Sequence, residues 1–153
     1  GLHGQSFNMY KFRTMKLNSH EMRSDLQDQN EHDAEIFKMD DDPRVLNGAK
    51  FIRSYSLDEF PQFFNVIKGN MSIVGPRPLF DEDTQLFNEN YMRRLNVLPG
   101  ITGLLQINER NTSEFSTWYK YDIEYIDNWT LFLDLKIILK TPLALVKGNT
   151  KGV

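Results

Sequence analysis

The alternation of apolar and polar side chains identifies three short strand candidates in this chain. Residues 5–12 (QSFNMYKF) alternate around Phe7 and Met9 and are rich in aromatic residues, which predicts a strand. Residues 71–74 (MSIV) predict a short buried strand that is broken by GPRP. Residues 98–107 (LPGITGLLQI) predict a Gly/Pro loop that runs into a third short strand. Strands therefore make up little of the expected fold.

Longer stretches carry helical signals. Ser19 is a candidate cap for a short helix, and Gly69 is a usual helix stop. In 81–95 the acids precede the arginines, as the helix dipole favours, and in 113–129 aromatic residues recur at helical spacing. Helices are expected over the ranges 19–29, 56–70, 81–95, 113–129 and 130–148. We therefore predict a helix-dominated α+β fold with a few short strands, forming one domain over 1–153.

The segment 130–148 (TLFLDLKIILKTPLALVKG) is the most apolar part of the chain. Asp134, Lys136, Lys140 and Pro142 interrupt it, which argues against a membrane span. Two arrangements remain. The segment is either a largely buried helix, which we favour because core helices are commoner, or an amphipathic helix on a membrane with its lysines toward lipid headgroups.

Composition narrows the classes of function. The chain has 153 residues, of which 40% are hydrophobic and 25% charged, as expected for a globular domain. A net charge of -3, without an aromatic-basic stripe, argues against nucleic-acid binding. The absence of cysteine excludes disulfides, thiol nucleophiles and cysteine-based zinc sites. His3, His20 and His32 lack ligand spacing, and the acid-rich stretch 18–42 is interpreted as a solvated surface.

The stretch SLDEFP (56–61) permits two interpretations. Ser56 and Glu59 have the spacing of a capping box, with Asp58 favoured by the helix dipole, and on the motif alone this structural explanation is preferred. Pro61 weakens it, because just past the first turn its ring and missing N–H distort a helix. At such an irregular start, Asp58 and Glu59 can converge on one metal ion or phosphate.

Basic residues occur in several motifs that could surround such a site. They are Lys11, Arg13, Arg44, Arg53, Arg77 and Arg110. Each one, taken singly, is more often a solvated residue or a surface ion pair. Arg77 differs because Pro76 and Pro78 fix the main chain on either side of it. Carboxylates mixed with arginines suit Mg²⁺ bound together with a phosphate ester.

The motifs together resemble a known family. DPRVLNGAKFIRSYSLDEFPQFFNVIKGNMSIVGPRP (42–78), YKFRTM (10–15), PGITGLLQI (99–107) and the tail from Asp122 to Thr141 are similar in order and spacing to the bacterial sugar transferases. These are monotopic polyprenyl-phosphate phosphoglycosyl transferases. The resemblance implies transfer of a sugar 1-phosphate from a nucleotide sugar, usually a UDP-sugar, to undecaprenyl phosphate, with release of UMP. It also implies association with the cytoplasmic face of the bacterial membrane, at the first membrane step of capsule, exopolysaccharide or glycoconjugate synthesis.

The resemblance also assigns roles to residues. Asp58 matches the nucleophile that forms a covalent phosphosugar, and Glu59 matches its Mg²⁺-binding partner, with Asp58 as a second metal ligand. Basic residues of the family around the phosphates match four positions: Lys11, Arg53, Arg77 and Arg110. Gln106 and Asp134 match other polar positions of the site. Glu109 stands where members of the family commonly have glycine, so the resemblance implies a stiffer loop than usual at Arg110.

Several questions stay open at this stage. Family members carry an N-terminal membrane-inserting helix that this sequence does not show, so we expect the chain to be a fragment. The alternative function is a catalytically silent nucleotide-sugar-binding or regulatory module of the same fold. Neither the transferred sugar nor the formation of a homo-oligomer can be read from these motifs.

Overall fold

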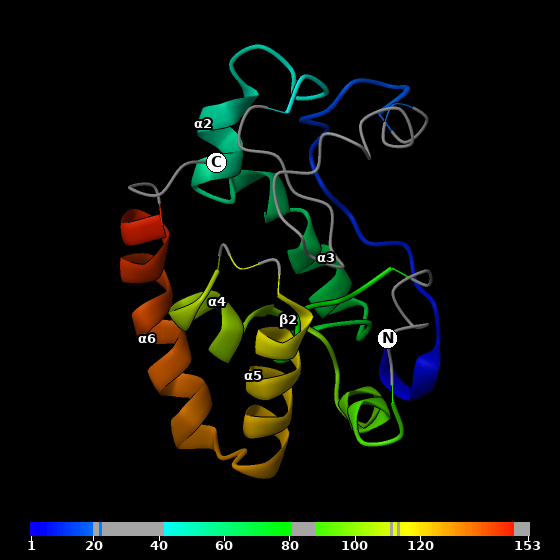
Figure 1. The fold of residues 1–153 in the computed structure, drawn as a ribbon, viewed down its shortest axis with the longest axis vertical. Coiled ribbons are helices and arrows are strands. Elements are labelled where there is room, and N and C mark those ends of the chain that lie inside the picture. The colour runs from blue at the N-terminus through cyan, green and yellow to red at the C-terminus, as the bar shows by residue number, and fades with distance from the viewer. Residues whose placement is uncertain (20–21, 23–41, 81–87, 111, 113, 149–153) are drawn as a thin grey trace.

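The computed structural model describes residues 1–19, 22, 42–80, 88–110, 112 and 114–148. These residues form an α+β fold in which helices dominate, as predicted (Figure 1). The α-helices are α2 (Ala49–Ser54), α3 (Gln62–Ile67), α4 (Leu104–Asn108), α5 (Phe115–Asp127) and α6 (Leu131–Gly148). The 3-10 helices are η1 (Leu2–Gly4), η3 (Leu57–Glu59) and η5 (Tyr91–Asn96), and the strands are β1 (Ser72–Val74) and β2 (Gly100–Thr102).

The strands β1 and β2 pair in parallel at the centre of the molecule. Ser72 pairs with Gly100, and Val74 pairs with Thr102. The strand predicted at 71–74 is therefore confirmed, although Ile73 is exposed on one side. The loop predicted at 98–107 does contain a strand, but it is followed by the short helix α4 rather than running into a strand at its end.

The strand predicted over 5–12 is wrong. In the part of the chain that the structure describes, this segment joins no ladder, and the nearby bridge between Met15 and Val45 is isolated. The side chain of Asn65 takes the place of a partner strand. It accepts the N–H of Tyr10 at 3.0 Å and donates to the carbonyl of Asn8 at 2.8 Å. One buried side-chain amide thus forms hydrogen bonds to two main-chain groups of this segment, which a partner strand would otherwise bind.

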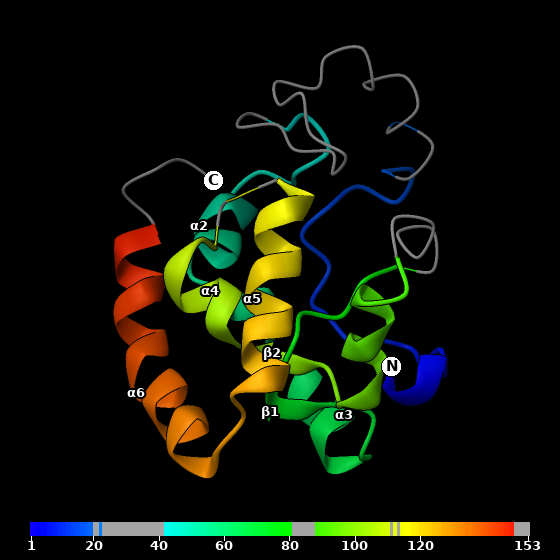
Figure 2. The same ribbon diagram turned by 60° about the horizontal axis from the view of Figure 1, so that its bottom comes forward.

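The core lies between the strands and the helices α4, α5 and α6. Val74, Leu104, Tyr125 and Ile137 form its buried cluster. Figures 1 and 2 show α6 along the outer edge of the molecule, beside α4. The helix predicted over 113–129 is confirmed as α5, which supplies Tyr125 to this core.

The remaining helix predictions have mixed outcomes. The helix predicted over 81–95 is a 3-10 helix, η5, in its last part, and residues 81–87 lie outside the described residues. Most of the helix predicted over 19–29 also lies outside them. The helix expected over 56–70 is divided into η3 and α3, and Gly69 follows its end with φ of 76°, as a helix stop requires.

The helix predicted over 130–148 is confirmed, but the prediction that it is largely buried is wrong. The segment forms α6, with Pro142 inside it, but Phe132 is 85% exposed and Leu139 76%. Only one side of α6 packs on the core, through Ile137 and its neighbours. None of the helices in the described ranges is both long and apolar enough to cross a membrane.

Close contact between two glycines joins the GPRP loop to β2. A Cβ added at Gly100 would lie 2.1 Å from the main-chain nitrogen of Gly75. We therefore expect Gly100→Ala to lower the free energy of unfolding by about 3 kcal/mol, since main chain cannot yield as a side chain does. Gly69→Ala is the matched control, because Gly69 has positive φ but no atom within 4 Å of an added Cβ. It should cost about 1 kcal/mol, and equal losses in urea unfolding would contradict the close-contact explanation.

Candidate active site

The two adjacent carboxylates lie on an irregular turn between α2 and α3. Ser56 has φ of 52°, the left-handed region, and η3 follows it directly. Pro61 is the N-cap residue of α3 and stands directly before its first residue, Gln62. The capping box is not formed, because Ser56 makes no side-chain capping bond and the Glu59 side chain binds cations instead. The distorted helix start that Pro61 predicted is confirmed.

Glu59 is held by two basic residues from distant parts of the chain. Lys11 Nζ lies 2.9 Å from Glu59 Oε1, and Arg77 Nη2 lies 3.3 Å from the same oxygen. Burial acts to raise the pKa of Glu59, but the charges of Arg77 and Lys11 outweigh it and lower the pKa to about 2. Glu59 is therefore a permanent carboxylate at neutral pH.

Asp58 lies beside this cluster and is buried, with 7% of its surface exposed. Burial raises the pKa of Asp58, and the charge of Glu59 adds to this effect, while Lys11 and Arg53 oppose it. The main-chain carbonyl of Asp58 accepts the N–H of Phe12 at 2.9 Å, which ties the KFRTM segment to the turn. A carboxylate that is poorly solvated, with cations nearby that pair with its neighbour, is suited to act as a nucleophile.

Arg110 completes one side of the turn. Its guanidinium donates to the carbonyls of Ser54 and Arg53, at the end of α2, and to Ser56 Oγ at 2.7 Å. Arg110 also interacts electrostatically with Glu59, Arg77 and Asp58. The hydroxyl of Ser56 therefore receives an arginine rather than capping a helix, a role that its sequence spacing did not indicate.

Two predicted site residues carry buried polar atoms that find no partner among the described residues. Both amide atoms of Gln106 are in this state, and so is Nε of Arg53, whose Nη1 donates to Thr14 Oγ1 at 3.2 Å. Buried polar groups are normally hydrogen-bonded, so each exception needs an explanation. These atoms are suited to bind a polar ligand.

Asp134 belongs to a different set of contacts. It accepts the hydroxyl of Tyr125 at 2.9 Å and the indole N–H of Trp129 at 3.2 Å, and so joins the end of α5 to α6. These contacts are separate from those that connect Lys11, Glu59 and Arg77. The predicted role of Asp134 in the site stays a prediction.

The donor set at the turn fits a magnesium ion that is shared with a phosphate. The described ranges hold no group of three or more Asp, Glu or His side chains that would form a complete protein cage. Mg²⁺ is usually held by one or two carboxylates together with substrate phosphates. Asp58 and Glu59 provide those carboxylates, and Glu59 Oε2 takes part in neither of the contacts to Lys11 and Arg77.

The fold and the turn define a small α+β domain with a carboxylate pair among cations, and comparison with known proteins identifies the family. The family description "Bacterial sugar transferase" matches residues 1–148, so the chain belongs to the bacterial sugar transferase family. It is 43% identical over 150 residues to a galactosyl transferase CpsE of Streptococcus agalactiae, covering 97% of this chain and 33% of that protein.

Two further relatives extend the comparison. The undecaprenyl-phosphate galactose phosphotransferase of Salmonella typhimurium is 40% identical over 154 residues, covering 97% of this chain and 32% of that protein. The exopolysaccharide production protein ExoY of Rhizobium meliloti is 40% identical over 145 residues, covering 92% of this chain and 64% of that protein. The chain thus spans between about a third and two thirds of the length of these relatives.

The low pKa of Glu59 makes stability depend on pH. A carboxyl whose pKa is lowered in the folded state stabilises that state. This contribution to stability is complete above the ordinary pKa of 4.5 and is lost as the pH falls toward about 2. We expect roughly 3 kcal/mol of unfolding free energy to disappear across this window. Asp58 contributes with the opposite sign, since its pKa is raised.

The test uses Asp58→Asn as its background, so that the titration of Asp58 does not contribute to the pH dependence of stability. Urea unfolding of Asp58→Asn is compared with that of Asp58→Asn/Glu59→Gln in buffer with a chelator, from about pH 6 downward. The first protein should lose stability more steeply. Parallel curves would show that Lys11 and Arg77 do not stabilise ionised Glu59.

Proposed function

We propose that this chain transfers a sugar 1-phosphate from a UDP-sugar to undecaprenyl phosphate through a covalent intermediate on Asp58, with release of UMP. The observation that carries the proposal is the buried Asp58 beside Glu59, which Lys11 and Arg77 hold ionised. The relative named an undecaprenyl-phosphate galactose phosphotransferase supports the sugar phosphate and the lipid carrier.

The first step forms a bond between Asp58 and phosphorus. A carboxylate oxygen of Asp58 attacks the phosphorus that carries the sugar, and the bond from this phosphorus to the bridging oxygen breaks. The bridging oxygen leaves with the electron pair as part of UMP. Asp58 is the better nucleophile of the pair, because both cations contact Glu59 rather than Asp58.

The second step returns the enzyme to its starting state. A phosphate oxygen of undecaprenyl phosphate attacks the phosphorus of the adduct, and the bond to Asp58 breaks with its electron pair on the carboxylate. The product is an undecaprenyl diphosphate sugar. Splitting the transfer means that two phosphorylated substrates need not occupy the site together.

The basic residues offset the repulsion between a carboxylate and a phosphate. Lys11 and Arg77 are already at Glu59, and Arg110 is fixed by main-chain carbonyls next to Ser56. Positioned cations of this kind stabilise charge as it develops on transferring phosphoryl oxygens. The unpartnered atoms of Arg53 and Gln106 are proposed to bind the donor.

Magnesium is part of the proposal. Glu59 and Asp58 would hold the ion together with a donor phosphate, and a bound ion would supply neutralisation of charge on the diphosphate. Chelation is therefore expected to abolish UMP release, and added Mg²⁺ to restore it.

A lipid acceptor is supported by exposed aromatic residues on both sides of the turn. Five exposed aromatics lie on α2 and around α3: Phe51, Tyr55, Phe60, Phe63 and Phe64. Aromatic and aliphatic side chains of this kind favour a membrane interface. We propose that the turn works against the cytoplasmic face of the bacterial membrane.

The test is direct. The full-length protein is incubated with a panel of UDP-sugars, Mg²⁺ and undecaprenyl phosphate, and UMP is assayed. Release of UMP that requires one of the sugars and Mg²⁺ is expected. Binding of a nucleotide sugar by calorimetry without any UMP release would instead favour the catalytically silent module.

A further inference from the structure

A set of buried polar contacts connects α5 with the main chain of the GPRP loop. Asp122 on α5 is 3% exposed, and its Oδ2 accepts the hydroxyl of Tyr91 at 2.7 Å. The same oxygen lies 3.1 Å from Nη2 of Arg94, which is also buried. Nη2 of Arg94 in turn donates to the main-chain carbonyl of Arg77. Two contacts, both made by Arg94, therefore lead from Asp122 on α5 to a residue of the candidate active site.

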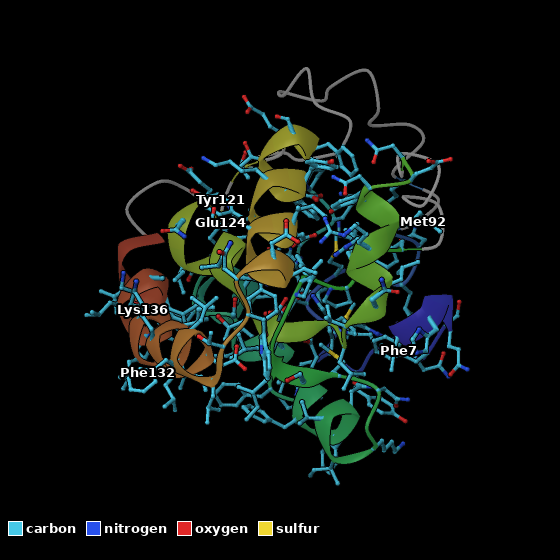
Figure 3. The ribbon with its side chains drawn as sticks, turned by 90° about the horizontal axis from the view of Figure 1, so that it is seen from below. Phe7, Met92, Tyr121, Glu124, Phe132 and Lys136 are labelled. Carbon is cyan, nitrogen blue, oxygen red and sulfur yellow. The ribbon has the colours of Figure 1, made fainter. Side chains whose placement is uncertain are left out.

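The elements that carry this network pack side by side. Figures 2 and 3 show η5, which carries Met92, alongside α5. The ring of Tyr91 is fully buried, with its centroid 5.0 Å from that of Phe115 and 5.2 Å from that of Tyr119. The guanidinium of Arg94 lies 4.9 Å from the centroid of Tyr91. Arg94 is thus held both by an aromatic ring and by Asp122.

Stability alone is a weak explanation for this arrangement. Removing two charges from water costs several kcal/mol for each ion, and apolar residues of similar size often serve a core equally well. The network ends at a functional position instead. The side chain of Arg77, whose carbonyl Arg94 binds, is one of the two cations on Glu59.

The GPRP loop is fixed from several sides at consecutive residues. Gly75 donates its N–H to the carbonyl of Thr102 at 2.9 Å, and the carbonyl of Pro76 accepts the N–H of Gly100 at 2.9 Å. Both of these contacts come from the main chain around β2. The side chain of Arg94 donates a hydrogen bond to the next carbonyl of the loop, that of Arg77.

We propose that Asp122 and Arg94 are positioning residues for the transfer reaction. Asp122 orients the guanidinium of Arg94, which fixes the main chain of Arg77 and so aims its side chain at Glu59 and the donor phosphates. This inference rests on the proposed function, since it assigns a role within the same site. Neither residue touches the reacting atoms.

A double-mutant cycle separates positioning from a structural role. The four full-length proteins are wild type, Asp122→Asn, Arg77→Ala and the double variant, and kcat/KM is measured by UMP release. Asp122→Asn is expected to lower kcat/KM by about 10- to 100-fold, as a misplaced binding group does. In the Arg77→Ala background the same change should cost less than about 3-fold. Equal losses in both backgrounds would overturn the proposal.

The measured stability provides an internal reference. The loss in unfolding free energy caused by Asp122→Asn should be the same in both backgrounds, since it comes from the buried ion pair. Asp127→Asn is the matched control, because Asp127 pairs with Arg93 between the same two elements but on the surface. It should change kcat/KM by less than about 2-fold.

Two additions keep the outcome decisive. If Asp122→Asn does not fold, Arg94→Lys is used in the same cycle, since lysine keeps the charge but lacks the guanidinium. The cycle is also run on UDP-sugar affinity by calorimetry, which reports on Arg77 without turnover. Wild type that binds but releases no UMP would refute the proposed function, while additive losses in affinity would refute the positioning role.

Discussion

Replacing Asp58 by asparagine is expected to reduce UMP release by at least about 10⁴-fold, because the amide cannot form the covalent phosphosugar. The folded protein should not lose stability. Burial raises the pKa of Asp58, which means that the folded state disfavours its charge, and a neutral side chain of the same shape relieves this. A large loss of rate with equal or higher stability is the signature of a residue kept for chemistry.

The proposed covalent step predicts a burst of UMP release. Wild type without undecaprenyl phosphate should release about one equivalent of UMP per active site and then stop, and Asp58→Asn should release none. Glu59→Gln is the matched variant, since it changes the neighbouring carboxylate but leaves Asp58 in place. It should keep a slow burst. If Asp58→Asn releases UMP as wild type does, Asp58 is not the nucleophile.

Sequence motifs predicted the residues of the candidate site, but not the contacts that these residues make. Lys11 and Glu59 are 48 residues apart and Arg77 is a further 18 away, so no local pattern shows which of the candidate basic residues contact Glu59. The capping box was wrong for a physical reason. Glu59 gains more from two cations than from one main-chain N–H, and Ser56 is drawn to Arg110 instead.

The sequence also does not show which charged side chains are buried. Arg93 and Arg94 are neighbours in the sequence and carry the same local signal. In the structure Arg93 forms an exposed pair with Asp127, whereas Arg94 forms a buried pair with Asp122. A sequence pattern reports residue type and spacing, but it does not report which side of a 3-10 helix meets a neighbouring helix.

The same limit explains the error about α6. Its apolar residues recur on two sides of the helix, and hydrophobicity alone suggested a core helix. Ile137 does enter the core and is fully buried. The outer side has no covering element in the described part of the chain. Its exposed apolar residues are Leu131, Phe132, Leu135, Ile138, Leu139, Leu143 and Val146.

This outer side has the arrangement of an interfacial helix. Lys136 follows Phe132 by four residues, and Lys140 follows it by eight, so both lie along one border of the apolar side. Figure 3 shows Phe132 and Lys136 on the outer side of α6, away from α5. Lysines beside a continuous apolar surface fit an anionic headgroup layer with its acyl region.

Replacing Phe132, Leu139 and Leu143 by glutamine is therefore expected to lower binding of the 153-residue chain to anionic phospholipid vesicles. Each side chain contributes about 1.5 kcal/mol when it leaves water, so the triple variant should bind about 10³-fold more weakly in co-sedimentation. Its unfolding free energy should change little, because these residues are exposed.

The control is Leu17→Gln, since Leu17 is 83% exposed but lies on a turn outside α6. Leu17→Gln should leave vesicle binding within about 3-fold of wild type, because a change away from the outer side of α6 acts independently of it. Unchanged binding by the triple variant would show that the outer side of α6 does not meet lipid. If that variant instead converts a sedimenting oligomer into a monomer, the surface belongs to a second copy of the chain, because the same apolar area can be covered only once.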